Sequence, residues 1–197
     1  IGEVLMAHVL LAKGEPAAAA ALLEPAAKTL DRTGYSWGPL ALSYLTTALA
    51  MQGEIAASAM ALSRAQSRHG TKSALFAPEL GVARAWRLVT IGDRPAAIAA
   101  PRGAARMAAR GGQYAIAVRA WHESARLGDR RAADGIASIA GQVPCAYTDM
   151  ARAHARAFTA GDAAGLADAA ARLAAAGFAG AAAEAARQAD DAAPLLP

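Results

Sequence analysis

Four histidines and one cysteine are the side chains of this chain best suited to catalysis or metal binding, and they are widely separated. The histidines are His8, His69, His122 and His154. The stretch "WHESA" (121–125) joins His to Glu but lacks a second His one turn later, so it does not match a zinc-binding helix. Cys145 is the only cysteine, which excludes an internal disulfide and a cysteine metal cluster. The sequence therefore predicts no catalytic residue, no metal site and no cofactor, and an enzyme is the least favoured interpretation.

Positive charge is the second feature that could do chemistry, since the chain carries 20 basic residues and a net charge of +4. Arg102, Arg106 and Arg110 recur every four residues and so would share one face of a helix. Such a face could bind an anion or nucleic acid, or it could simply be a solvated outer surface. The segment lacks interleaved aromatic residues for base stacking, which favours the solvated surface. We expect no direct nucleic-acid contact by this chain.

A short sequence pattern that repeats along the chain predicts the helices and turns that position these residues. A Gly followed at once by Asp or Glu and then by an alanine-rich run occurs five times, as in "IGDRPAA" (91–97) and "LGDRRAA" (127–133). The glycines are Gly14, Gly53, Gly92, Gly128 and Gly161. Each Gly can end a helix in the left-handed conformation, and the acidic residue suits the start of the next helix. The pattern predicts antiparallel helical hairpins of about 33–39 residues each.

The composition indicates helices throughout, because 55% of residues are hydrophobic but only 5% are aromatic and alanine supplies most of the rest. The expected helices are 2–13, 16–30, 38–51, 54–68, 76–91, 94–110, 113–127, 131–141, 146–160, 163–176 and 178–190. We expect a kink or a split at Pro25 and Pro101, which fall inside two of them.

The predicted fold class is all-α: a right-handed superhelical α-solenoid of about five TPR-like helical hairpins. The hairpins form one domain over residues 1–190, and residues 191–197 form a linker toward a missing C-terminal module. A compact orthogonal helical bundle is the alternative. The chain begins without Met and inside an expected helix, so we expect it to be a fragment of a longer protein.

Counting six residues back from each turn glycine selects one position in every first helix, on the side expected to line a concave groove. These residues are His8, Thr47, Trp86, His122 and Ala155, with Trp121 as a substitute for its neighbour His122. A groove with Trp, His and Thr could bind an effector molecule or a partner protein. We expect an effector to contact Trp86 and at least one of Thr47 or His122. The alternative is that Trp86 and Trp121 are core residues.

Longer phrases in the second half of the chain carry a family resemblance. They are "GVARAWRLVTIGDRPAAIAA" (81–100), "AVRAWHESARLGDRRAADGIASIAGQV" (117–143) and "ARAHARAFTAGDAAGLADAAARLAAAGFAGAAAEAARQA" (151–189). In this order they resemble the tetratricopeptide-like repeat region of large ATP-binding LuxR-type transcriptional regulators, just before the DNA-binding module. The resemblance covers roughly residues 38–190.

The resemblance implies a parent protein with an N-terminal ATPase and a C-terminal helix-turn-helix. This chain has neither the G-x-x-x-x-G-K-[ST] phosphate loop nor the helix-turn-helix, so ATP binding and DNA binding belong to the parent. The implied role is a cytoplasmic sensor and interaction module that binds an effector or partner protein, could self-associate, and is not tied to a membrane. A free-standing repeat adaptor for protein–protein interaction is the alternative.

Overall fold

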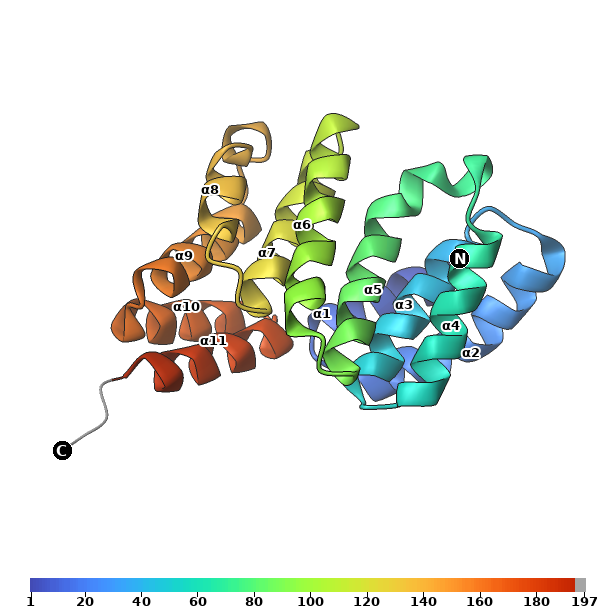
Figure 1. Ribbon diagram of the computed structural model, residues 1–197, viewed down its shortest axis with the longest axis horizontal. Coiled ribbons are helices and arrows are strands. Elements are labelled where there is room, and N and C mark those ends of the chain that lie inside the picture. The colour runs from blue at the N-terminus through green and yellow to red at the C-terminus, as the bar shows by residue number, and fades with distance from the viewer. Residues whose placement is uncertain (194–197) are drawn as a thin grey trace. The chain divides into compact units, whose positions relative to one another are not determined.

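A computed structural model describes residues 1–193, and the regular structure in that range is entirely helical, as the composition predicts (Figure 1). The helices are α1 (Gly2–Ala12), α2 (Pro16–Thr33), α3 (Gly38–Met51), α4 (Ile55–Arg68), η1 (Thr71–Phe76), α5 (Ala77–Thr90), α6 (Arg94–Arg110), α7 (Tyr114–Arg126), α8 (Ala132–Ala137), η2 (Ala140–Gln142), α9 (Ala146–Ala160), α10 (Ala163–Ala175) and α11 (Ala179–Ala192). In the described part of the chain, no helix combines the length and the apolar character needed to cross a membrane.

Most expected helix limits are within three residues of the observed ones, and the exceptions have local causes. The single helix expected over 131–141 is wrong, because α8 ends at Ala137 and the short 3-10 helix η2 follows. Of the kink or split expected at Pro25 and Pro101, the split is absent, since α2 and α6 run through these prolines, and the kink stays a prediction. In α2, Leu23, Ala26 and Ala27 are buried around Pro25, and their packing offsets one missing backbone hydrogen bond.

The glycine turns are formed as the repeated phrase predicts. All five glycines have positive φ, from 67° at Gly161 to 101° at Gly128, a region where only glycine is unstrained. The acidic residues behave less uniformly. Asp162 Oδ1 accepts a hydrogen bond from Gly165 N at 2.9 Å and so caps α10, whereas Glu15 makes no such side-chain bond at the start of α2. The glycine is therefore the constant part of the turn, and the carboxylate is an optional cap.

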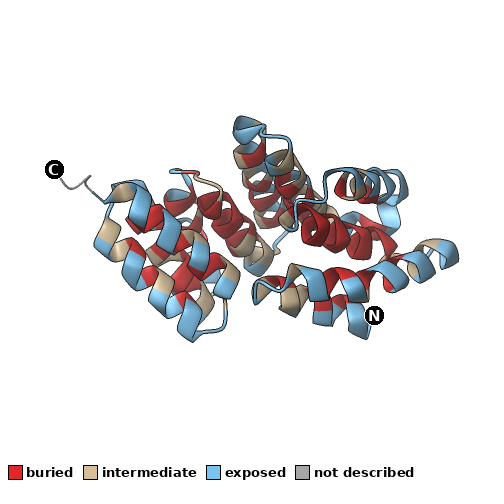
Figure 2. Cartoon of the chain, turned by 90° about the horizontal axis from the view of Figure 1, so that it is seen from below, coloured by how far each residue is buried: buried red, intermediate tan, exposed pale blue. Residues whose placement is uncertain are grey.

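The helices group into two compact units. Unit 1 contains Ile1–Leu11 and Glu15–Ala104, and unit 2 contains residues 105–193 together with Ala12–Gly14. The helix α11 continues past the expected end at residue 190 to Ala192, and the rest of the expected linker, residues 194–197, lies outside the described residues. In both units the buried residues lie on the helix sides that face other helices (Figure 2).

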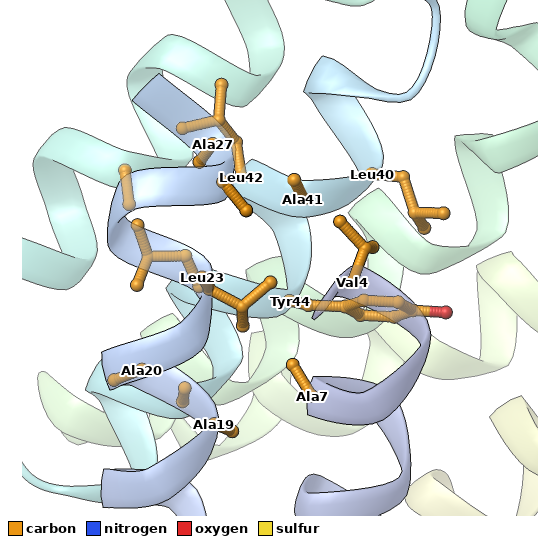
Figure 3. Close-up of a cluster of buried hydrophobic side chains, with 14 of the residues drawn as sticks. Val4, Ala7, Ala19, Ala20, Leu23, Ala27, Leu40, Ala41, Leu42 and Tyr44 are labelled. Carbon is orange, nitrogen blue, oxygen red and sulfur yellow. The ribbon is translucent and has the colours of Figure 1, made fainter. Parts of the chain in front are cut away.

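Helix α3 is the centre of unit 1. It packs against α2, α4 and α5, and all of its residues from Gly38 to Ala50 are buried. Its Leu42 and Tyr44 lie among small and branched side chains of the first hairpin, such as Leu23 and Ala7 (Figure 3). The side chain of Gln52 joins the second hairpin to the first by donating to the carbonyl of Pro16 at 3.3 Å.

Unit 2 repeats this plan around α7 and α9. Helix α7 packs against α8 and α9, and α9 also packs against α8 and α10. The indole of Trp121 rests directly on the backbone of α8 at Gly135, where a Cβ atom would overlap the ring. Helix α11 pairs with α10 and also reaches α7 and α9. These three helices, α7, α9 and α11, enclose the polar cluster described next.

Candidate functional site: a buried histidine relay and a polar pocket

A chain of four side chains crosses the interior of unit 2. The Tyr147 hydroxyl lies 3.0 Å from His122 Nδ1, His122 Nε2 lies 2.9 Å from His154 Nδ1, and His154 Nε2 lies 2.8 Å from Gln188 Oε1. Gln188 Nε2 then donates to the carbonyls of Ala125 and Arg126 at 3.0 and 3.2 Å. Both histidines and Gln188 are buried. We call Tyr147, His122, His154 and Gln188 the histidine relay.

The Gln188 amide fixes the direction of the last hydrogen bond of the relay, and the neutral state of the two rings then sets the other two. Because the Gln188 amide nitrogen serves the two carbonyls, its oxygen faces His154 and can only accept, so His154 Nε2 carries the proton. The neutral His154 ring then accepts at Nδ1 from His122 Nε2–H. His122 Nδ1 accepts in turn from the Tyr147 hydroxyl. With both imidazoles neutral, every hydrogen bond of the relay has one donor and one acceptor, whereas with both imidazoles protonated the facing nitrogens His122 Nε2 and His154 Nδ1 would both be donors.

Burial enforces that neutral state. Desolvation holds the pKa of His122 well below its usual value, with added repulsion from His154 and the Arg126 guanidinium. Burial also lowers the pKa of His154, although the hydrogen bond to Gln188 opposes the shift. Burial raises the pKa of the Tyr147 phenol, and the nearby charge of Glu123 adds to the effect. The phenol therefore stays a donor to His122.

A cluster of ion pairs lies beside the relay in the interior of unit 2. Arg126 is buried and its Nη1 lies 2.6 Å from Glu123 Oε1, while its Nε and Nη2 both bind the Glu184 carboxylate, the latter at 3.1 Å. Burial alone would lower the pKa of Arg126, but the two carboxylates outweigh it and raise that pKa. Burial raises the pKa of Glu184, and its pairing with Arg126 opposes the shift. The cluster ties α11 to α7 by charge-assisted bonds.

The polar side chains of this interior hold the helices of unit 2 together through hydrogen bonds and ion pairs. The relay ends on backbone carbonyls, which cannot take up a proton, so it offers no path for proton transfer through the unit. Both nitrogens of each imidazole are already engaged, and the described residues contain no group of three His, Cys, Asp or Glu side chains placed to hold a metal ion. The relay and the ion pairs make the packing of α7, α9 and α11 dependent on the protonation of two histidines.

The residues expected to line a groove occupy different places in the two units. In unit 1 the partly buried His8 ring lies 4.9 Å from the Tyr44 ring, and Thr47 Oγ1 donates to the Ser43 carbonyl at 3.2 Å. Trp86 is buried in α5. The placement of these three side chains does not show whether an effector binds beside them, so the ligand groove stays a prediction. The same placement requires a ligand to displace packed side chains before it could reach Thr47 or Trp86.

In unit 2, the neighbours Trp121 and His122 are both buried in α7 and serve different contacts. Trp121 packs on Gly135 of α8, whereas His122 belongs to the relay with α9. The expected ligand contact of His122 stays a prediction, and the described structure engages both its ring nitrogens internally.

The three arginines expected on one helix face do lie along the single helix α6. Arg106 and Arg110 are exposed, and Arg102 is partly buried. The Arg106 guanidinium carbon is 6.0 Å from the centre of the Trp121 ring, a distance at which a cation–π contact is weak. Whether this face binds an anion stays a prediction.

A polar pocket of about 370 Å³ opens in unit 1 between the loop after α2 and the loop after α4. Its lining includes Tyr35, Ser36, Lys72 and Asp31. Asp31 is held by Arg64 at 2.8 Å and by Arg68 at 2.7 Å, and the hydrogen bond from Arg64 keeps the pKa of this carboxyl below its usual value. The volume lies in the range of small-molecule sites.

Three residues that line the polar pocket, Gly34, Tyr35 and Ser36, belong to a sequence pattern that the prediction of no catalytic residue overlooked. Residues 34–38 read G-Y-S-W-G, which has the G-x-S-x-G spacing of a hydrolase nucleophile turn. That turn requires a strand before the serine and a helix after it. Here the segment joins two helices, α2 and α3, so the spacing alone does not make Ser36 a nucleophile.

Sequence reasoning found His122 but missed its partners. His154 stands next to Ala155, the residue selected by counting back from Gly161, so a shift of one position would have paired the two histidines. Tyr147, Gln188 and Glu184 carry no periodic signal, because their partners lie on other helices. Comparison of the chain with family models, with curated proteins and with solved structures finds no match.

Proposed function

We propose that this chain is the sensor and interaction module of a LuxR-type transcriptional regulator, and that its hairpins are TPR-like repeats stacked in a right-handed superhelical solenoid. The module binds an effector or a partner protein and couples that binding to transcription activation by the parent protein. ATP binding and DNA binding are functions of the parent and not of these residues.

Recurring neighbour relations among the helices are the observation that carries this proposal. In unit 1 the first helix of a hairpin, α3, packs against its own partner α4, the preceding helix α2 and the next first helix α5. In unit 2 the same relations join α7 to α8 and α9, and α8 to α9. Repeat proteins are built in this way, and they use their extended surfaces to bind other molecules.

The distribution of polar chemistry also supports binding rather than catalysis. The strongly shifted groups His122, Arg126 and Tyr147 are committed to one another and to neighbouring helices. The polar pocket of unit 1, in contrast, presents the exposed residues Tyr35, on the loop after α2, and Lys72, in η1, around a space large enough for a small effector. An effector that binds one conformation better than another would shift the parent protein toward its active assembly.

A transcript comparison tests the proposal in the organism that carries the gene. Three strains are compared with the parent strain: a gene deletion, a chromosomal Lys72→Glu/Tyr35→Ala variant, and a control Lys28→Glu variant with an exposed charge on α2, outside the pocket lining. We expect the deletion to change a defined set of transcripts and the pocket variant to change the same set, while the control leaves it intact. A deletion that changes no transcript would refute the regulatory role and favour the adaptor.

A further inference from the structure

One face of α1, together with Ile1 directly before it, exposes large apolar side chains. Ile1, Leu5, Met6 and Val9 are 50%, 53%, 54% and 49% exposed, although the opposite face of the same helix buries Val4 and Ala7. Positions 1, 5 and 9 fall one helical turn apart, and Met6 lies beside them, so the four side chains form one stripe. We call Ile1, Leu5, Met6 and Val9 the α1 stripe. A continuous exposed apolar stripe of this kind marks an interaction surface.

The repeat register shows what the equivalent positions do elsewhere in unit 1. The turn glycines Gly14 and Gly53 are 39 residues apart, so each residue of α1 corresponds to the residue 39 positions later in α3. The α1 stripe thus corresponds to Leu40, Tyr44, Leu45 and Ala48, all of which are buried. The same four positions are covered in the second hairpin and open in the first.

The first hairpin is what covers those positions in α3. The Tyr44 ring stacks 4.9 Å from the ring of His8 on α1. Figure 3 shows Tyr44 lying beside Val4 and Ala7, and Leu40, Leu45 and Ala48 belong to the same buried cluster as these residues of α1. The positions of the α1 stripe are therefore those through which a hairpin of this chain receives the hairpin before it.

We infer that the α1 stripe is the docking surface for one further helical hairpin of the same kind, seated as α1 and α2 are seated on α3. The partner that fits is a two-helix hairpin with a face of small and branched apolar residues, as Val4, Ala7 and Leu23 provide in the first hairpin. A hairpin that ends a stack carries a polar outer face, and α1 does not have one. The inference depends on the repeat register and not on the role in transcription.

An extended chain tests the docking directly. A copy of residues 1–39 is placed before Ile1, so that α1 follows the copied hairpin as α3 follows the original. Hydrogen exchange of the α1 amides is compared in the extended and the original chain. We expect hydrogen exchange of the α1 amides to slow by about tenfold or more, because a second packed face suppresses local opening of the helix. Unchanged exchange in α1 would overturn the inference.

Two substitutions check that the stripe itself is responsible. Leu5→Glu should restore fast exchange in the extended chain, while in the original chain it should leave the urea midpoint almost unchanged, since Leu5 is exposed there. The matched control Met60→Glu changes an exposed residue of α4 and should have little effect in either chain. Equal effects of Leu5→Glu in both chains would contradict docking on the stripe.

Two further outcomes would also overturn the inference. In one variant of the extended chain, three of the four stripe residues are replaced by their counterparts in α3, as Leu5→Tyr, Met6→Leu and Val9→Ala. Protection of α1 in this variant but not with the native residues would show that the native stripe is not a docking face. A dimer of the original chain in sedimentation equilibrium, dissociated by Leu5→Glu, would assign the stripe to a second copy of the chain instead.

Discussion

Acid should destabilise unit 2 through the histidine relay. Burial favours the neutral forms of His122 and His154 in the folded relay, so it lowers the pKa of both below the usual value of 6.5. The unfolded chain takes up a proton on each histidine near pH 6.5, whereas the folded chain does not. The free energy of unfolding is therefore at its full value above the unfolded-state pKa and decreases as the pH falls through 6.5 and toward the lower folded-state values.

The size of the effect follows from the number of protons excluded. At about pH 5.5, one unit below the unfolded pKa, a histidine that stays neutral in the fold costs about 1.4 kcal/mol, so the two together cost at most about 2.8 kcal/mol. Glu184 acts with the opposite sign, because its raised pKa favours proton uptake by the folded state. Its effect acts between its raised folded-state pKa and the ordinary value of 4.5, so it offsets part of the loss caused by the histidines as the pH falls.

The assay is urea unfolding at about pH 8 and about pH 5.5, followed by helical circular dichroism and by hydrogen exchange in α9, which reports on unit 2. A His122→Gln/His154→Gln variant is less stable at both pH values but should lose most of the pH dependence. His69→Gln, which lies outside the relay in unit 1, is the matched control, and its stability should keep the pH dependence of the unsubstituted chain. A double variant whose stability still falls by about 2.8 kcal/mol on acidification would refute the role of the relay.

Three further predictions concern single residues. Gly135→Ala should destabilise unit 2 by about 1–3 kcal/mol because its Cβ overlaps the indole packed on α8, whereas Gly103→Ala, with open space around it, should be neutral or stabilising; equal urea midpoints would contradict this. Arg126→Gln should cost about 3–5 kcal/mol by leaving two carboxylates unpaired in the interior, and a loss below about 1 kcal/mol would argue against the ion-pair cluster. The exposed Cys145 thiol has its pKa lowered by hydrogen bonding to Thr148, so iodoacetamide near neutral pH should alkylate it faster than in Thr148→Val; equal rates would contradict that bond.

The sequence predicted the helices well because their signals are local. A glycine that must adopt positive φ, such as Gly92 or Gly128, marks a turn whatever surrounds it. Failures arose where packing decides. The helix expected over 131–141 ends at Ala137. The split that was one of the two outcomes expected at Pro25 is absent, because the buried residues around it hold α2 together. The division of the helices into two units also depends on packing and leaves no local signal.

The site was less predictable, for a physical reason. Counting back from the glycines locates a position along a helix, and it led to His122 as one of the positions to test. It cannot tell whether that position faces a groove or another helix, since this depends on residues far away in the chain. The partners of His122 lie 25 and 32 residues further on, at Tyr147 and His154, and Gln188 lies further still. Only the packing of α7, α9 and α11 brings them together.

The most direct test of the central claim is the sequence of the complete reading frame that encodes this chain. If the chain is the sensor and interaction module of a LuxR-type regulator, the frame will encode a G-x-x-x-x-G-K-[ST] phosphate loop upstream and a helix-turn-helix within about a hundred residues downstream. A frame that stops just after residue 197 and encodes no ATPase upstream would contradict the claim and leave the free-standing adaptor.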